Sequence, residues 1–585
     1  MASSLFRRKP IASALREHEP DVAHPHPEGH GTGLHKTLGV RDLTFFGIAA
    51  IIGAGSFSSM GTACASGGPG VVLLFVMCAV ACGFTAMCYA EFAARVPVSG
   101  SAYTYAYVSF GELFAWIIGW ALLMEYSIGN IYVAFSWSGY FTNLLEAFHI
   151  HMPAWLTVNY TSAHASELAL QAKRFVLHVQ PDQAKASADI ASSVLSEGVR
   201  AWNTAPQLGP LRIIFDLPAV LINALITALV YVGVKESRNA SNIMVMIKLA
   251  IVALVIIVGA TQIDIENWTP FLPNGFGGVM AGVSAVFFAY IGFDAVSTLA
   301  EESKDPQRDL PKSMVWSLVI CTTLYILLAL VLTGMVPFAL LGVSDPLAEV
   351  FELTGVKWML LIVSIAAVVA MTSVMLVFQL GQPRIWMSMS RDGLLPPRFG
   401  HLHRKYRTPA FSTVVTGLVV GIPIFFTDEN FILDFTSIGT LFAFVLVCGG
   451  VLLLPRKEKT PGRFNMPYVS AKFIVPSLLL LGLAVVVWLD PNHFHRLLGR
   501  TGFAPDIPML VFYVLCAVVA VYCFLREWSL IPVLGLLSCC YLLTGMAVSN
   551  WMWFSIWLLV GLGCYFAYGY RKSKLAQSGT ADGGG

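Results

Sequence analysis

The stretch GIAAIIGAGSF, residues 47–57, places three glycines inside a long apolar run. Glycine in a helix interior costs about 1 kcal/mol relative to alanine, so this run indicates a helix that is interrupted there. Amides freed at a helix start bind anions such as carboxylates, and glycine lets the ligand approach the backbone without an intervening side chain. The candidate amides are those of Gly53, Ala54, Gly55 and Ser56.

A second stretch of the same kind, FFAYIGFDAVSTLAEE, covers residues 287–302 and has a glycine and an aspartate inside an apolar run. The carbonyls freed in the two stretches could accept hydrogen bonds from an ammonium group. The candidate acceptors are Ile51, Phe288, Ala289 and Ile291. Close helix packing is the alternative interpretation of the glycines, but two interrupted helices in corresponding positions favour a binding site.

Two charged side chains fall deep inside apolar runs. Lys248, in NASNIMVMIKLAIVALVIIVG, has no carboxylate one turn away, and a lysine at the centre of a membrane helix costs roughly 2.5–3.5 kcal/mol. It could extend toward the surface, yet it lies roughly ten residues from the polar end of its helix. Because burial disfavours the charged ammonium, proton release there is feasible. Glu125, in GWALLMEYSIG, could recognise a cationic side chain, or it could bind a backbone group or hydroxyl in a purely structural role.

The elements that position these residues are membrane spans. The chain has 585 residues, 56% hydrophobic and 12% charged, whereas soluble domains carry about 25% charged residues. Runs of about 20 apolar residues give fourteen candidate spans: 42–65, 69–90, 112–145, 213–234, 240–262, 278–300, 313–336, 357–388, 410–427, 431–454, 471–489, 508–525, 528–547 and 551–570.

The basic residues predict the orientation of these spans. With a cytoplasmic N-terminus, 27 of the 36 Lys and Arg fall in internal segments, eight in external segments and Lys248 inside a span, as the positive-inside rule requires. We therefore expect a multi-pass protein of the plasma (inner) membrane with both termini cytoplasmic. The predicted tails are residues 1–40 and 571–585. The only sizeable external insert is 146–212, with short amphipathic helices and a glycosylation sequon at Asn159.

Cysteine and histidine placement argues against other chemistries. The eleven cysteines fall in or beside apolar runs, so neither a disulfide framework nor a zinc spacing is indicated. All thirteen histidines lie outside the spans, which removes histidine bases and haem or quinone ligation from the bundle. HPHPEGHGTGLH, in the N-terminal tail, could bind metal, but such a Pro- and Gly-rich tail is more often disordered. We expect no cofactor and no metal site.

Four motifs in order resemble one transporter superfamily. GIAAIIGAGSF, AEFAARVPVSGSAYTYAYVSFGELFAWIIGW, FFAYIGFDAVSTLAEESKDPQRDLP and GQPRIWMSMSRDGLLPPRFG are similar to the amino acid–polyamine–organocation superfamily, and most to its cationic amino acid transporter branch. The resemblance runs from about residue 36 to 455. It implies an all-α, five-plus-five inverted-repeat fold, with repeats at 41–262 and 278–455. Four further helices would occupy 471–570, giving about fourteen spans.

The same resemblance implies roles for individual residues. Phe288 matches an aromatic gate over the substrate and Asp294 an acidic gating position. Lys248 matches the cation position of proton-coupled members, and Glu91 a structural or gating position. Further expectations are that Met371, Thr372 and Ser373 line the pocket, and that five residues in cytoplasmic loops make gate-closing ion pairs: Asp305, Arg308, Asp309, Arg391 and Asp392.

The implied function is secondary active uptake of cationic or small neutral L-amino acids, coupled to protons. Exchange or uniport without proton coupling is the alternative, and a channel is the other class. A channel would need a continuous polar lining, whereas the polar breaks concentrate at one depth. Expected partners are the amino acid, protons and the lipid bilayer, with no nucleic acid and no enzymatic activity. A small accessory membrane subunit is left open.

Overall fold

The computed structural model describes most of the chain. The described residues are 5–10, 38–98, 100–179, 192–209, 211–232, 237–343, 345–406, 408–427, 429–454, 464–489, 491, 494, 497–498 and 507–576. The histidine-rich stretch of the N-terminal tail lies outside them. The described part is almost entirely helical, as the apolar runs predict, apart from a two-stranded antiparallel ribbon of β1 (Gln207–Leu208) and β2 (Leu211–Arg212).

The first apolar segment is interrupted where its glycines predict. Helix α3 (Val40–Ile51) ends at Ile51, and Ile52 is extended, with φ −79° and ψ 103°. The chain resumes through a π-helical turn at Gly55–Ser59 and continues as α4 (Met60–Gly67). Two half-helices therefore meet inside the protein.

The second interruption lies between α13 (Val283–Phe288), which follows the short α12 (Gly275–Ala281), and a 3-10 helix at Asp294–Glu302. Gly292 stands in the gap with φ +118°, and a Cβ there would lie 2.7 Å from the Ala50 Cβ. Only glycine suits both this conformation and this contact. The two interruptions thus pack directly against each other.

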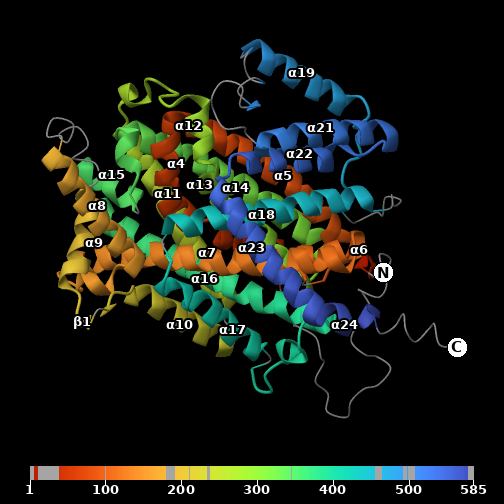
Figure 1. The fold of residues 1–585 in the computed structure, drawn as a ribbon, viewed down its shortest axis with the longest axis horizontal. Coiled ribbons are helices and arrows are strands. Elements are labelled where there is room, and N and C mark those ends of the chain that lie inside the picture. Colours follow the sequence, from red (N-terminus) through yellow and green to blue (C-terminus); the bar gives the residue numbers. More distant parts are fainter. Residues whose placement is uncertain are drawn as a thin grey trace.

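The other helices form a bundle around this pair. Their bounds are α5 (Val71–Arg95), α6 (Ser101–Ser109), α7 (Glu112–Ala147), α10 (Leu217–Val232), α11 (Ser237–Ala260), α14 (Pro306–Met335), α15 (Pro346–Leu353), α16 (Lys357–Arg391), α17 (Ala410–Gly421), α18 (Glu429–Leu453), α19 (Ile474–Leu489), α21 (Ile507–Arg526), α22 (Leu530–Thr544), α23 (Val548–Cys564) and α24 (Tyr570–Lys572). Helices α7 and α16 pack along each other through the centre (Figure 1).

Eight helices in the described residues are long and apolar enough to cross a membrane, and four more apolar helices are shorter. One of these spans, Gly55–Arg95, takes in the outer half of the first interrupted segment, whereas α3 and both halves of the second interrupted segment are not among the helices counted. The protein is therefore a multi-pass membrane protein, while the count of fourteen spans and the internal repeat stay predictions.

The C-terminal helices are attached to the bundle unequally. Helix α22 packs on α5 and α18, and α23 crosses α7, whereas α19 and α21 lie further out, at the upper right of Figure 1. The insert between α7 and α10 contributes α8 (Tyr160–Val179) and α9 (Ser192–Thr204), which pack on each other. Asp216 joins the insert to the bundle, because Ser138 of α7 donates a 2.6 Å hydrogen bond to its carboxylate.

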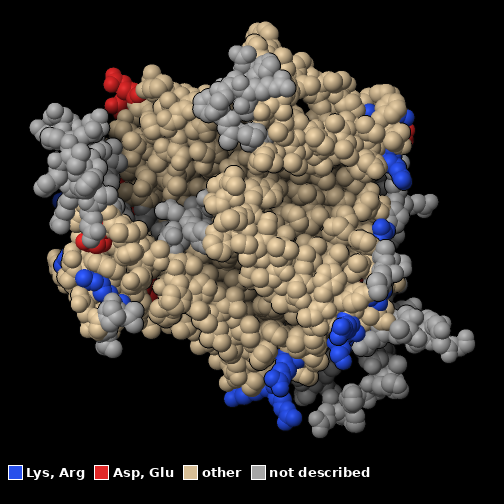
Figure 2. Space-filling model, in the orientation of Figure 1, with Lys and Arg blue, Asp and Glu red and all other residues tan. Residues whose placement is uncertain are grey.

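Charged side chains avoid the middle of the molecular face drawn in Figure 2. In Figure 2 most of the lysines and arginines lie along the lower and right edges, with a smaller group at the left edge, and a broad uncharged band crosses the face; Figure 1 places both chain ends at the right. This separation agrees with the predicted orientation, in which the basic side is cytoplasmic.

Candidate functional site

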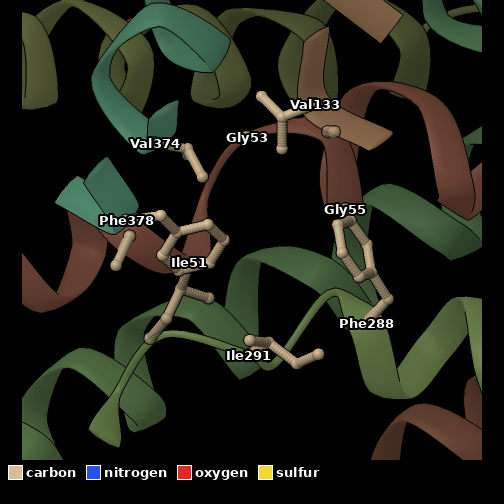
Figure 3. A pocket seen from close by; sticks show the side chains of 10 residues that line it. Ile51, Gly53, Gly55, Val133, Phe288, Ile291, Val374 and Phe378 are labelled. Carbon is tan, nitrogen blue, oxygen red and sulfur yellow. The ribbon is translucent and has the colours of Figure 1, made fainter. Parts of the chain in front are cut away.

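A small cavity lies at the first interruption. It is lined by Ala50, Ile51, Gly53, Ala54, Gly55, Val133, Phe288, Ile291, Val374 and Phe378. Its volume is about 10 Å³, enough for about one water molecule. Figure 3 shows the lining side chains around the open turn between Ile51 and Gly55. Every one is hydrocarbon, so the polar groups that can face the cavity come from the backbone.

The glycines bring the walls of this cavity together. A Cβ on Gly55 would lie 2.5 Å from the Ala289 Cα, and one on Gly53 would lie 2.3 Å from a methyl carbon of Val374. Side chains at either position would separate the first interruption from the second or from α16. The sequence uses glycine here for close approach.

Backbone groups at the first interruption are partly engaged. The amides of Gly53, Ala54 and Gly55 stand at the start of the outer half-helix, where amide N–H groups lack intrahelical partners. The amide of Ser56 instead donates to the Gly53 carbonyl at 3.0 Å, so it is already used. The Ile51 carbonyl accepts a 2.8 Å hydrogen bond from the Tyr325 hydroxyl.

Six of the ten predicted substrate contacts line this cavity: Ile51, Gly53, Ala54, Gly55, Phe288 and Ile291. Ser56, Glu125, Ala289 and Met371 do not, although all four are buried. Four lining residues were missed: Ala50, Val133, Val374 and Phe378. Helical periodicity could have found Val374 and Phe378, which lie about one and two turns after Met371 on α16.

The aromatic walls are held by partners from α7. The Phe288 ring packs edge-on against Tyr132 with centroids 4.7 Å apart, and the Phe378 ring stacks on Tyr126 at 5.4 Å. Such pairs are worth about 0.5–1.5 kcal/mol beyond area burial. Phe288 and Phe378 therefore have defined positions and can move only if α7 contacts are released.

Lys248 is fully buried and points at the first interruption. Its ammonium donates hydrogen bonds to the carbonyl of Ala49 at 3.1 Å, the carbonyl of Ile52 at 2.8 Å and the hydroxyl of Ser373 at 2.7 Å. These three acceptors complete the donor capacity of an ammonium group. One cation from α11 thus ties the open turn of the first segment to α16.

Two further carboxyl groups are buried in the bundle but do not line the cavity. Glu125 and Asp294 are both 0% exposed and are close enough to interact electrostatically. Gly292 donates its amide to one oxygen of Asp294 at 3.3 Å. Within the described residues, the second oxygen of Asp294 and both oxygens of Glu125 have no hydrogen-bond partner of normal geometry, although the Thr440 hydroxyl lies near the Glu125 carboxyl group. Buried carboxyls without partners are costly, so this pair is a candidate functional feature.

Ion pairs cluster at the end of the bundle that carries the chain termini. Arg384 of α16 pairs with Glu302 at 2.5 Å, and Asp392 pairs with Lys9 at 2.7 Å. Glu91 pairs with Arg95 at 2.6 Å and accepts the amide of Met466 at 2.9 Å.

Of the predicted ion pairs, the part of the chain that the structure describes forms only the one at Asp392. Asp305, Arg308, Asp309 and Arg391 make none there. Arg384 and Glu302, which were not predicted, close the same region instead.

Comparisons with known proteins identify the family. The family model described as "Amino acid permease" matches residues 38–519, and that described as "C-terminus of AA_permease" matches 530–573. The chain is 35% identical over 578 residues to a branched-chain amino acid permease of Bacillus subtilis, covering 99% of this chain and 100% of the relative. It is 34% identical over 574 residues to a methylthioribose transporter of the same organism, covering 98% and 99%.

A third relative, a cationic amino acid transporter of Arabidopsis thaliana, is 28% identical over 660 residues, covering 98% of this chain and 96% of the relative. These matches span both interruptions and the C-terminal helices, and the proteins they name are transporters rather than enzymes. The chain belongs to the amino acid permease family.

Proposed function

We propose that this protein carries neutral amino acids with apolar side chains across a membrane, coupled to protons, by alternating access around the two helix interruptions. The contact of Lys248 with the open turn is the observation that carries the proposal. Its ammonium donates to the carbonyls of Ala49 and Ile52 and to the Ser373 hydroxyl. The neutral amine has only two N–H donors, so loss of its proton breaks at least one of these three hydrogen bonds beside the cavity. Protonation and substrate binding then depend on the same few residues.

The proposal assigns the two ends of the substrate to opposite backbone groups. The carboxylate binds the amides of Gly53, Ala54 and Gly55, at the positive end of the outer half-helix. The ammonium binds carbonyls of the second interruption between Phe288 and Ile291. Phe288, beside both, gates the cavity. Because the cavity holds only about one water molecule in this structure, substrate entry requires its walls to separate.

The walls favour an apolar substrate side chain. Val133, Val374 and Phe378 offer hydrocarbon alone, and burying apolar surface against them stabilises binding by about 25 cal/mol per Å². A charged side chain would lose its hydration there without a partner. The branched-chain permease among the relatives has a name that agrees with this choice.

A cationic substrate is the second candidate. Among the described residues, three carboxylate oxygens of Glu125 and Asp294 lack a hydrogen bond of normal geometry, with only the Thr440 hydroxyl near Glu125, and a guanidinium or ammonium group could satisfy them. The named cationic transporters among the relatives agree with this alternative. It requires the substrate side chain to extend past the aromatic wall toward α7.

The orientation and repeat belong to the same proposal. Two interrupted segments five spans apart suit an inverted five-plus-five repeat with both termini cytoplasmic, and the basic edge in Figure 2 supports this orientation. The plasma membrane remains the proposed location. Exchange or uniport stays the alternative to proton symport.

The test is uptake into liposomes containing the purified protein. Radiolabelled L-leucine and L-arginine are offered separately, with an imposed inward proton gradient or none, in sodium or choline buffer. We expect leucine accumulation that needs the proton gradient and is indifferent to sodium. Lys248→Ala and Lys248→Arg should abolish accumulation, since arginine does not deprotonate in a protein. Both should retain leucine binding if Lys248 acts in coupling.

The outcomes separate the parts of the proposal. Gradient-driven accumulation by either Lys248 variant would contradict coupling through this residue. Accumulation of arginine and not leucine would replace the apolar substrate by the cationic one. Uptake of neither amino acid, by a protein that remains folded, would contradict the substrate assignment as a whole.

A further inference from the structure

The N-terminal segment of the chain is docked in a site built for it. Residues 6–9 run beside the start of α7: the Lys9 amide donates to the Tyr107 carbonyl at 3.2 Å, and the Glu112 amide donates to the Arg7 carbonyl at 2.9 Å. Gly111 has φ +110°, and a Cβ there would lie 2.7 Å from the Phe6 carbonyl carbon. A side chain at position 111 would therefore exclude the segment.

Lys9 anchors this segment to the end of α16. Its ammonium pairs with one oxygen of Asp392 at 2.7 Å, and the Tyr103 hydroxyl donates to the other oxygen at 2.7 Å. The Lys9 and Asp392 side chains are only 7% and 10% exposed. An ion pair taken out of water in this way is costly to break on one side alone.

The C-terminal end of the chain completes the same structure. Glu112 is fully buried and accepts hydrogen bonds from the hydroxyls of Tyr565 at 2.9 Å and Ser573 at 2.5 Å. The Lys574 amide donates to the Asp392 carbonyl at 3.1 Å. The two chain ends therefore meet on two buried carboxylates, one beginning α7 and the other following α16.

Helix α23 holds the C-terminal end in place. Trp116 and Trp120 of α7 donate their indole N–H groups to the carbonyls of Gly561 at 2.8 Å and Trp557 at 2.9 Å. A Cβ on Gly561 would lie 2.4 Å from a ring carbon of Trp120, so the helices approach closely. Helix α23 therefore positions the residues that bind Glu112.

We propose that residues 6–9 and 565–574 form a clasp on Glu112 and Asp392 that holds the side of the transporter carrying both chain ends closed and must release before substrate leaves there. Helices α7 and α16 supply Val133, Val374 and Phe378 to the cavity, so their ends are where an exit path must widen. This proposal does not depend on which amino acid the protein carries; it requires only that the transporter opens on this side.

The clasp works through the balance between closed and open states. In the closed state Lys9, Asp392 and Glu112 have their partners, and separating the ends of α7 and α16 breaks those bonds. Removing one partner favours the open state and leaves the cavity residues unchanged. Arg8, the exposed neighbour of Lys9, makes no ion pair among the described residues and offers a control with the same charge.

The experiment measures access from the clasp side. A Ser303→Cys reporter is placed where the second interrupted segment ends, in a Cys564→Ser background. The ten other native cysteines are buried or half-buried. Ser303 is fully buried. Labelling by a membrane-impermeant maleimide is followed in vesicles that expose the clasp side, for the parent, Lys9→Gln, Lys9→Arg and Arg8→Gln.

A second reporter separates gating from general loosening. Ser284→Cys lies on α13, the outer half of the same segment, and is also buried. We expect Lys9→Gln to raise labelling at position 303 at least about tenfold, the change that about 1.4 kcal/mol produces, and to leave labelling at 284 unchanged. Lys9→Arg, which keeps the ion pair, and Arg8→Gln should label like the parent.

Two results would overturn the clasp. One is parent-like labelling at 303 in a folded Lys9→Gln protein, and the other is an equal rise at both reporters. If Lys9→Gln does not fold, Tyr565→Phe takes its place, since it removes only one of the hydroxyls that bind Glu112. That variant must raise labelling at 303 and not at 284, and a parent-like rate would contradict the proposal.

Discussion

Gly55→Ala adds one methyl group at the point where the two interruptions touch. The new carbon would lie 2.5 Å from the Ala289 Cα, 3.0 Å from its Cβ and 3.3 Å from its amide nitrogen. Two of these neighbours are backbone atoms, which cannot rotate away. Ordinary contact begins at 3.4 Å, so the two segments must part by about 0.9 Å, the difference between 3.4 and 2.5 Å.

The shift has two separable consequences. Overpacking of this kind costs about 1–3 kcal/mol of folding free energy, against about 1 kcal/mol gained from better helix propensity. An amide moved by about 0.9 Å from a carboxylate oxygen no longer makes a hydrogen bond. A hydrogen bond to a charged group is worth about 1.5–3 kcal/mol, so substrate affinity should fall roughly 10- to 150-fold.

Gly139→Ala is the matched control. It lies in α7, and a Cβ there has nothing within 4 Å. Binding of radiolabelled leucine and the thermal unfolding midpoint are measured for both variants. We expect weak binding by a folded Gly55→Ala protein and unchanged binding by Gly139→Ala. Equal affinities for the two variants would refute the assignment of the carboxylate to this backbone.

Three further outcomes are expected. Ser373→Ala removes one acceptor from the Lys248 ammonium, so the pH midpoint of leucine uptake should move to lower pH by about one unit; an unchanged pH profile counts against coupling at that contact. Glu125→Gln should change leucine binding by no more than about twofold, and a tenfold loss in equilibrium binding would place Glu125 on the substrate. Burial, with the nearby Glu349 carboxylate, raises the pKa of Asp345 from 3.8 to about 6, so its contribution to stability falls as pH rises through that window. At pH 8, Asp345→Asn should therefore raise the unfolding midpoint and increase the free energy of unfolding by at most about 3 kcal/mol. At pH 3 it should not, and equal effects at both pH values would contradict the titration of Asp345.

The sequence alone predicts the parts of the site that depend on backbone chemistry. Glycines in an apolar run have few explanations, so the first interruption could be placed at Gly53–Gly55 and the second near Gly292. Lys248 stood out because a lysine in a span is expensive, and the structure puts its ammonium on the first interruption.

The remaining features depend on contacts between distant segments. Val133 looks like any other apolar residue of a span, and only the packing of α7 on α16 brings it to the cavity. Lys9 belongs to a tail with no apolar pattern, and its partner Asp392 is 383 residues away. No local periodicity could join them, and the same holds for Glu112 and Ser573.

A structure determined with L-leucine at saturating concentration tests the central claim most directly. The account predicts the leucine carboxylate within about 3 Å of the amide nitrogens of Gly53, Ala54 or Gly55, with its side chain against Val374 and Phe378. Leucine bound elsewhere, with this cavity still closed and the amides of the first interruption unoccupied, would contradict it.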